Sequence, residues 1–488
     1  MSAGARQGGT STARDDQVAD PRRWKALSVC LVAGFMTLLD VSIVNVALPS
    51  IRTGLEAPQS DLQWVVSGYA LTFGLILVPA GRFGDMYGRR NAFAFGVALF
   101  TLSSAAAGIA QNSTWLVVAR LVQGIAGGLI NPQVSGLIQQ LFRGAERGKA
   151  FGLLGATIGI STAIGPMLGG LIIRLGGEQD GWRYVFDVNV PIGVLAIVLA
   201  YRYIPKPAEK RPRKSMDPVG VLLLGIGVVL ILLPLVESQE WHGAVKWVLP
   251  AAGVAVLGVF VAWERRYARR GEPVVDLALF RRRSYGLGAL IAALYFAGFT
   301  AIFFILTLYL QEGLHYSPLA AGLASTPFAA GSAAASVFGG RIVTRLGRPL
   351  VAVGLVLVGV GLVAVEIAVR LVPGQHVAWA IAVPLLVAGA GSGLVISPNQ
   401  TLTLSEVPVA HAGSAGGVLQ TGQRIGTAVG IAVVGSAFFT QVVSSHGDYA
   451  TAFRHALYVT IGFVVVTLAV ALTDVLADRR SPGERPVH

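Results

Sequence analysis

The sequence has few charged residues for its length. Only 13% of the 488 residues are Asp, Glu, Lys or Arg, whereas 54% are hydrophobic. Soluble domains carry about 25% charged residues, so this scarcity excludes a soluble globular protein. The mean hydropathy of +0.66 indicates an integral membrane protein instead.

Several kinds of reactive site are missing as well. A single cysteine, Cys30, excludes an intramolecular disulfide. The nearest string to a G-x-x-x-x-G-K-[ST] phosphate loop, RGAERGKA, has Arg143 in place of the first glycine and Ala150 in place of Ser or Thr. The sequence contains no H-E-x-x-H motif, and its seven histidines fall in or close to predicted loops. We therefore expect no ATP hydrolysis, no enzyme activity, no cofactor and no metal.

Long apolar runs fill most of the chain. A membrane-spanning helix needs about 20 mostly apolar residues, and the polar stretch 1–24 lacks the apolar core of a signal peptide. The predicted fold class is thus an all-α integral membrane protein with 14 transmembrane helices, at 25–49, 62–83, 91–111, 114–141, 149–173, 184–203, 217–236, 246–263, 285–311, 318–340, 349–370, 377–404, 412–443 and 453–476.

The basic residues lie mainly in alternate loops. With the N-terminus inside, the tails and cytoplasmic loops hold 30 of the 38 Lys and Arg residues. The excess of basic residues in cytoplasmic loops predicts that both termini are cytoplasmic. The net charge of +13 therefore comes mainly from short loops that connect the spans of a protein embedded in the lipid bilayer. No nucleic acid is expected as a partner. Heavy use of Arg, Ala, Gly and Val indicates a GC-rich bacterial genome, and hence a multi-pass protein of the bacterial inner (cell) membrane.

The chain contains an internal repeat. AGRFGDMYGRR (80–90) recurs as GGRIVTRLGRP (339–349), an offset of 259 residues, and GLINPQ (128–133) is echoed by GLVISPNQ (393–400). Parallel repeats of this kind are typical of one transporter architecture. The predicted division is a disordered cytoplasmic tail (1–24), a six-helix bundle (25–205), a linker with two inserted helices (206–283), a second six-helix bundle (284–476) and a cytoplasmic tail (477–488).

Asp40 lies inside the apolar run FMTLLDVSIVNVALP. A carboxylate near the bilayer centre costs about 2.5–3.5 kcal/mol, and such residues mark ion or substrate paths. The alternative is a structural residue near a helix end, but Asp40 is more than two turns from Lys25 and from Pro49. We therefore predict a functional carboxylate and, in the absence of a membrane histidine, the proton carrier.

Arg120, in the run WLVVARLVQG, is the natural partner of Asp40. The depths of the two residues allow them to meet if their helices adjoin. The pair is either a static structural ion pair or a proton-coupling site in which protonation of Asp40 frees the arginine.

Two glycine-rich segments are candidates for moving parts. The loop GRFGDMYGRR is predicted to be a conformational latch rather than an ordinary basic turn, because it is repeated and because Asp85 can cap a neighbouring helix. The latch residues are Gly81, Arg82, Gly84, Asp85, Gly88, Arg89 and Arg90. The segment GLLGATIGISTAIGPMLGGLI combines close helix packing with a proline bend, and the hinge residues are Gly159, Gly165, Pro166, Gly169 and Gly170.

These motifs together resemble the major facilitator superfamily, in particular its fourteen-span drug:proton antiporters. LDVSIVNVALP (39–49) resembles the span-1 motif, GRFGDMYGRR the loop 2–3 motif, ARLVQG (119–124) the span-4 motif and GPMLGG (165–170) the antiporter motif of span 5. Ser42, Ser161 and Thr344 depart from the usual residues, and Thr344 in the place of Asp85 indicates a weaker second latch.

The resemblance implies two bundles, spans 1–6 and 9–14, that rock around a central cavity with spans 7 and 8 outside. It also implies export of amphipathic small molecules driven by proton entry, by a protein expected to function as a monomer. Gln420, Gln423 and Arg424 share a helix face, which either lines the cavity or forms hydrogen bonds between helices. The full expected cavity set is Asn45, Trp64, Tyr69, Gln123, Tyr295, Phe299, Gln420, Gln423 and Arg424.

Three functions are consistent with this pattern. The first is an antiporter of hydrophobic or cationic drugs, the second a dedicated exporter of one metabolite or self-made antibiotic, and the third a membrane sensor or scaffold. Uptake and lipid transport are further alternatives that the pattern favours less. Glu366 and Asp187 match no motif, and we expect them near the outer boundary of their spans.

Overall fold

The computed structural model describes residues 20–177, 179–206, 217–236 and 245–480. These residues form helices and no strand. Most of the predicted tails 1–24 and 477–488, and part of the linker 206–283, lie outside the described residues. The part that is described is therefore all-helical.

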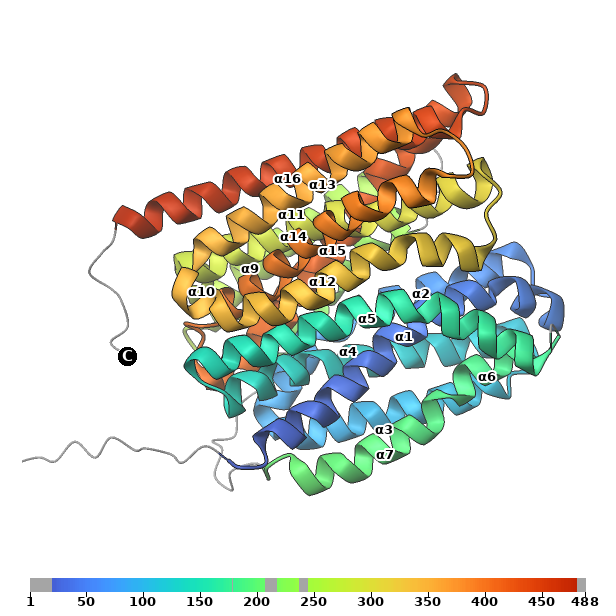
Figure 1. Cartoon of the computed structure of the whole chain (residues 1–488). Coiled ribbons are helices and arrows are strands. Elements are labelled where there is room, and N and C mark those ends of the chain that lie inside the picture. Colours follow the sequence, from blue (N-terminus) through green and yellow to red (C-terminus); the bar gives the residue numbers. More distant parts are fainter. Residues whose placement is uncertain (1–19, 178, 207–216, 237–244, 481–488) are drawn as a thin grey trace, which may run out of the picture.

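The helices of the described chain follow one another in sequence order (Figure 1). The N-terminal half contains α1 (Arg23–Leu55), α2 (Gln59–Tyr87), α3 (Arg89–Gly108), α4 (Ser113–Leu141), α5 (Gly144–Gly176), α6 (Gly181–Asp187) and α7 (Asn189–Tyr203). Next come α8 (Pro218–Val236), α9 (Val245–Tyr267) and α10 (Ala278–Arg281). The C-terminal half contains α11 (Arg283–Leu308), a π-helical turn (Tyr309–Gly313), α12 (Pro318–Leu346), α13 (Arg348–Leu371), α14 (Val377–Thr403), a 3₁₀ turn (Val409–His411), α15 (Ala412–Ser444) and α16 (Tyr449–Arg480).

Thirteen helices of the described chain are long and apolar enough to cross a membrane, with α6 and α7 together forming one of them. The remaining predicted span, 318–340, is the 29-residue helix α12. Its sequence is rich in Ala, Gly and Ser, which lowers its hydropathy, and it packs against both α5 and α14. Small side chains let neighbouring helix backbones approach closely in lipid. Helix α12 therefore has the length of a span without the composition of a lipid-facing one.

The helix ends carry recognisable signals. The side chain of Asn112 accepts a hydrogen bond from the backbone N–H of Trp115 (2.8 Å) at the start of α4, and the Ser317 side chain accepts one at the start of α12. Gly88 and Gly347, which are equivalent in the repeat, have φ of +97° and +61° between successive helices. A glycine adopts such backbone angles without the strain imposed by a Cβ atom.

The helices form two groups that cross at two places. Helices α1–α7 lie together below α11–α16 in Figure 1, and α5 packs on α12 while α2 packs on α15. Helices α8 and α9 pack on each other, and α8 also contacts α2 and α15. The described chain begins and ends at the same end of the molecule (Figure 1), which we name the terminal end.

Glycines of the repeat permit both crossings. A Cβ atom on Gly81 of α2 would lie 2.2 Å from the carbonyl oxygen of Gly413 in α15, and one on Gly340 of α12 would lie 2.3 Å from that of Gly148 in α5. Because Gly81 and Gly340 occupy the same position in the two repeats, equivalent glycines bring the opposite halves into backbone contact.

Candidate functional site

A cavity of about 270 Å³ lies between the two halves. Its walls come from α1, α2, α4 and α5 on one side and from α11, α14 and α15 on the other. Towards one end, Gln420 of α15 donates a hydrogen bond to Ser135 of α4 (3.2 Å), and Gln400 of α14 donates one to the same hydroxyl (3.3 Å). Polar contacts between opposite halves therefore form part of the cavity boundary.

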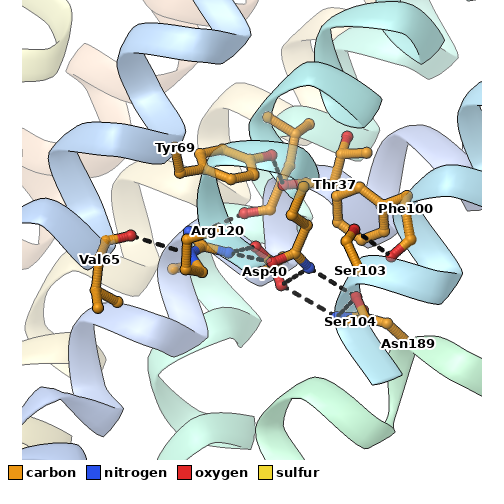
Figure 2. A network of polar contacts seen from close by, with 12 residues as sticks. Thr37, Asp40, Val65, Tyr69, Phe100, Ser103, Ser104, Arg120 and Asn189 are labelled. Carbon is orange, nitrogen blue, oxygen red and sulfur yellow. Dashed lines mark hydrogen bonds and ion pairs between the residues drawn. The ribbon is translucent and has the colours of Figure 1, made fainter. Parts of the chain in front are cut away.

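Asp40 belongs to a compact polar network (Figure 2), and its neighbours Leu38 and Val41 on α1 line the cavity. The residue is 1% exposed, and its carboxylate accepts a hydrogen bond from Arg120 Nη1 at 2.5 Å. Gln123 Nε2 and Asn189 Nδ2 donate to its other oxygen at 2.9 and 3.1 Å. Three helices, α1, α4 and α7, are thus joined through one carboxylate.

Arg120 is buried with its partner. Besides Asp40, it donates to the backbone carbonyl of Val65 (3.0 Å) and to Gln123 Oε1 (2.7 Å), and its guanidinium lies 4.2 Å from the centre of the Tyr69 ring. Tyr69 itself lines the cavity, whereas Asp40 is absent from the lining. The ion pair therefore lies behind an aromatic side chain that contacts the cavity.

Two members of this network are not predicted to bond to Asp40. Asn189 belongs to no motif that we identify, and Gln123 is expected in the substrate cavity, but the structure places its amide on Asp40 and on Ser104 Oγ (2.7 Å). A neutral polar residue in an apolar run is the sequence signal for Asn189, and it is weak because most such residues only bond to neighbouring helices.

The predicted latch loop binds the opposite half. Asp85 accepts hydrogen bonds from the backbone N–H groups of Gly413 (3.1 Å) and Ser414 (2.9 Å), and from the Ser414 hydroxyl (2.9 Å). These groups belong to the first turn of α15, where unpaired N–H groups and the helix dipole attract a carboxylate. Asp85 thus caps α15 from across the interface between the halves.

The arginines of this loop have different partners. Arg89 pairs with Asp85 (2.9 Å), donates to the carbonyl of Gly136 (2.8 Å) and reaches the carbonyl of Val409. Arg82 pairs with Glu272 (2.9 Å), which follows α9, and Arg90 lies over the ring of Tyr201 at 5.3 Å. Arg82 therefore connects the predicted latch with the segment after α9.

The remaining latch glycines make room for these contacts. Gly84 faces the Gln133 amide, whose oxygen would be 1.8 Å from a Cβ atom. In the second repeat, Arg348 pairs with Asp474 of α16 (2.9 Å) and donates to Ser284 (2.9 Å), both in its own half. The two equivalent arginines therefore differ, since Arg89 also bonds to Val409 of the opposite half.

The predicted hinge residues of α5 face two different helices. A Cβ atom on Gly165 would lie 2.3 Å from Ser42 Cβ of α1, and one on Gly169 would lie 3.3 Å from the Ile43 carbonyl oxygen. Gly159 faces Ala329 and Ala333 of α12, and Pro166 lies against Gly322. A Cβ atom on Gly170 would meet no neighbouring element within 4 Å. Helix α5 is thus held between α1 of its own half and α12 of the other.

The expected cavity residues separate into four groups. Tyr69, Phe299, Gln420, Gln423 and Arg424 line the central cavity. Asn45 lines a smaller space next to Arg120 and an outer one beside Arg52. Trp64, which is 37% exposed, and Tyr295, which is packed against Phe296 and Phe299, line neither. Gln123 belongs to the Asp40 network.

Glu366 and Asp187 lie away from this cavity. Asp187 ends α6 and lies against Gly108 of α3. Glu366 of α13 is 6% exposed, pairs with Arg370 and with Arg454 (3.1 Å), and accepts a hydrogen bond from Tyr458 (2.7 Å). Since Arg454 and Tyr458 are in α16, Glu366 joins two helices of the same half.

Replacing Glu366 with glutamine is expected to lower stability and to spare transport. Loss of charge-assisted hydrogen bonds to a buried group costs about 1–3 kcal/mol, so the thermal midpoint of the purified protein should fall. The matched control is Glu312→Gln, at an exposed glutamate in the π-helical turn. An unchanged midpoint together with lost transport would instead place Glu366 on the transport path.

Comparison with known proteins identifies the family. The Major Facilitator Superfamily model matches residues 30–431 and 288–487. The chain belongs to the major facilitator superfamily. It is a multi-pass membrane protein of a transporter family, as its motifs predict.

The relatives of this chain include an antibiotic transporter and an antibiotic resistance protein. The chain is 38% identical to a probable actinorhodin transporter of Streptomyces coelicolor, over 89% of this chain and 76% of the relative. It is 32% identical to a puromycin resistance protein of Streptomyces alboniger, over 95% and 93%. The solved structure of a human organic anion transporter superposes with a TM-score of 0.67 at 15% identity, over 92% and 100%. That last likeness shows the fold alone.

Proposed function

We propose that this chain is a proton-coupled exporter of amphipathic small molecules, working by alternating access in the bacterial cell membrane. The observation that carries the proposal is the buried Asp40–Arg120 ion pair behind the wall of the central cavity. The distance between Arg120 Nη1 and Asp40 Oδ2 is 2.5 Å. The described residues contain no group of three His, Cys, Asp or Glu side chains that could hold a metal. The proton gradient is the proposed energy source.

Protonation of Asp40 would change the network that surrounds it. The carboxylate accepts bonds from Arg120, Gln123 and Asn189, and a neutral carboxyl accepts such bonds more weakly. Uptake of a proton would therefore loosen the contacts that hold α1, α4 and α7 together at this carboxylate.

A continuous set of contacts links this switch to the interface between the halves. Asp40 is followed on α1 by Ser42 and Ile43, which contact Gly165 and Gly169 of α5. Gly159 of the same helix contacts Ala329 and Ala333 of α12. A shift of α1 on protonation would therefore reach the α5–α12 crossing through packed residues.

The proposed cycle uses both ends of the molecule. A cavity open to the terminal end, placed in the cytoplasm by the loop charges, binds substrate while Asp40 is charged. The halves rock, a proton from outside loads Asp40, and the substrate leaves. One proton moving through 100 mV supplies about 2.3 kcal/mol, enough for nearly fifty-fold accumulation of a neutral solute. In this proposal α8 and α9 are an insertion beside the two bundles, and the monomer is the working unit.

A dedicated exporter of one antibiotic is the second candidate. It is favoured by the relatives, which include the probable actinorhodin transporter and a tetracenomycin C resistance and export protein of Streptomyces glaucescens. Such an exporter would share the coupling site and differ in the breadth of its cavity.

The proposed function is tested with purified protein in liposomes. We expect the wild-type protein to accumulate fluorescein or rhodamine 123 against its gradient only while a pH gradient is imposed, with protons moving in the opposite direction. A lumenal pH dye measures the proton movement, and an uncoupler should abolish both. Uphill transport that survives the uncoupler would contradict proton coupling, whereas export of a single aromatic antibiotic and of neither dye would favour the dedicated exporter.

A further inference from the structure

Arg424 is a cation in the middle of the membrane-spanning region. It lies within α15, and its guanidinium is 4.4 Å from the centre of the Phe73 ring of α2. Within the described parts of the chain, no hydrogen bond or ion pair links Arg424 to another side chain. Charged residues inside a membrane usually pair with one another or line a path for a charged species.

The charges around the cavity leave Arg424 unbalanced. Among the described residues that line the cavity, Arg424 is the only charged one. Arg120 is its charged neighbour in the smaller adjoining space, but that residue is already paired with Asp40. The Asp40–Arg120 pair has no net charge when Asp40 is ionised, so the cavity keeps one positive charge.

The rest of the cavity suits an aromatic molecule. Phe296, Phe299 and Phe303 of α11 lie on one wall, with neighbouring ring centres 5.4 and 5.5 Å apart. Tyr69 and Phe73 of α2 lie on another wall. Gln423, next to Arg424, also lines the cavity and has no hydrogen-bond partner among the residues that the structure describes. Planar rings can stack on these walls, while the amide and the guanidinium supply donors.

We propose that the central cavity selects aromatic organic anions, with a carboxylate or phenolate of the substrate pairing with Arg424 and its rings packing against Phe296, Phe299 and Phe303. This inference rests on the proposed function, because it takes the cavity to be the substrate site. It replaces the expectation of cationic substrates, since a cation would meet an unpaired guanidinium and no carboxylate in the lining.

The test measures binding of two dyes that share a xanthene ring system. Fluorescein is an anion at pH 8 and rhodamine 123 is a cation, so their affinities separate the effect of charge from that of aromatic area. Fluorescence polarisation with the purified full-length protein gives both Kd values in the absence of any gradient. Wild-type protein is expected to bind fluorescein at least about tenfold more tightly, the factor that one charge-assisted hydrogen bond supplies.

Variants at the site should weaken or keep this preference according to the charge that they leave beside the cavity. In Arg424→Gln, the Kd for fluorescein should rise about tenfold or more, while the Kd for rhodamine 123 stays the same or falls. Arg424→Lys keeps the charge and should keep the preference. Gln423→Glu places a carboxylate beside the guanidinium and should weaken fluorescein binding. Arg266→Gln, at an exposed arginine of α9, removes a positive charge elsewhere and should change neither Kd.

The outcomes separate this inference from the proposed function. Tighter binding of rhodamine 123 to the wild-type protein would overturn the inference, as would equal changes in both Kd values in Arg424→Gln. The wild-type ratio decides the sign even if that variant does not fold. Proton-driven export of rhodamine 123 but not fluorescein would keep the proposed function and reject the anion. Selective binding of fluorescein without proton-driven accumulation would support the preference for anions and contradict the proposed function.

Discussion

Replacing Asp40 with asparagine is expected to abolish uphill export. The amide has nearly the same shape, so it can still accept bonds from Gln123 and Asn189, but it cannot take up or release a proton. With one proton per substrate, the accumulation ratio should fall from about fifty-fold at 100 mV to about one. Downhill exchange of substrate for substrate, which needs no proton, should persist.

The measurement compares two assays in the same liposomes. Accumulation is followed under an imposed pH gradient, and exchange is followed with no gradient. Asp180→Asn is the matched control, because Asp180 has a 70% exposed side chain. Normal accumulation in Asp40→Asn would remove Asp40 from the coupling mechanism.

Stability is the main complication of this variant, and it has its own control. Breaking a buried ion pair leaves Arg120 uncompensated, which costs about 3–5 kcal/mol. The double variant Asp40→Asn with Arg120→Gln removes both charges and should recover much of the lost thermal stability. It should not recover uphill export, since no proton carrier is restored. Recovery of both would show that the pair has a structural role only.

Replacing Gly81 with valine is expected to prevent closure at the crossing of α2 and α15. Its Cβ atom would lie 2.2 and 2.5 Å from the carbonyl oxygen and carbon of Gly413. Both are backbone atoms at the start of α15, so no side-chain rotation relieves the clash. Overpacking costs about 1–3 kcal/mol or more, which disfavours the closed state by about five- to 150-fold.

Labelling of a cavity cysteine can measure this change. Thr162 lines the cavity, and Cys30 is the sole natural cysteine, so Thr162→Cys in a Cys30→Ala background gives one reporter. In Gly81→Val, a membrane-impermeant maleimide should label it faster from the terminal end, and transport should fall. Gly340→Val should act alike at the α5–α12 crossing, where a Cβ atom would lie 2.3 Å from the Gly148 oxygen.

The same substitution elsewhere provides the control. Gly462 of α16 is exposed, and a Cβ atom at this position would meet no neighbouring element within 4 Å. Gly462→Val should therefore leave both labelling and transport unchanged. If Gly81→Val transports normally, the contact between Gly81 and Gly413 is not part of the working cycle.

Composition and hydropathy predicted the spans well because the bilayer imposes a local requirement. Each segment that crosses the hydrocarbon core must satisfy its own backbone hydrogen bonds. Such a segment appears in the sequence as a long run of apolar residues. Helix α12 is the exception, since its small residues serve contacts with α5 and α14 rather than with lipid. Asp40 and Arg120 stood out for a related reason, because a charge in an apolar run is costly unless it is paired or used.

Which way each side chain faces was harder to predict. Trp64 and Tyr295 were expected in the cavity, yet one is partly exposed and the other is packed behind Phe299. Gln123 and Asn189 carry no charge that would mark them as partners of Asp40 in the sequence, and their bonds to it come from segments 83 and 149 positions away. Helix rotation depends on packing with several neighbours, which one sequence does not specify.

The lipid environment, the repeat and the two buried charges follow from the order of residues alone, because lipid penalises polar groups wherever they occur in a span. The tertiary structure sets which residues meet across the helices. It placed Tyr69 between the ion pair and the cavity, set Asp85 on the first turn of α15, and left Arg424 as the one charge in the described lining. These arrangements arise from close packing between segments that are distant in the sequence, so their physical cause lies in the assembled fold.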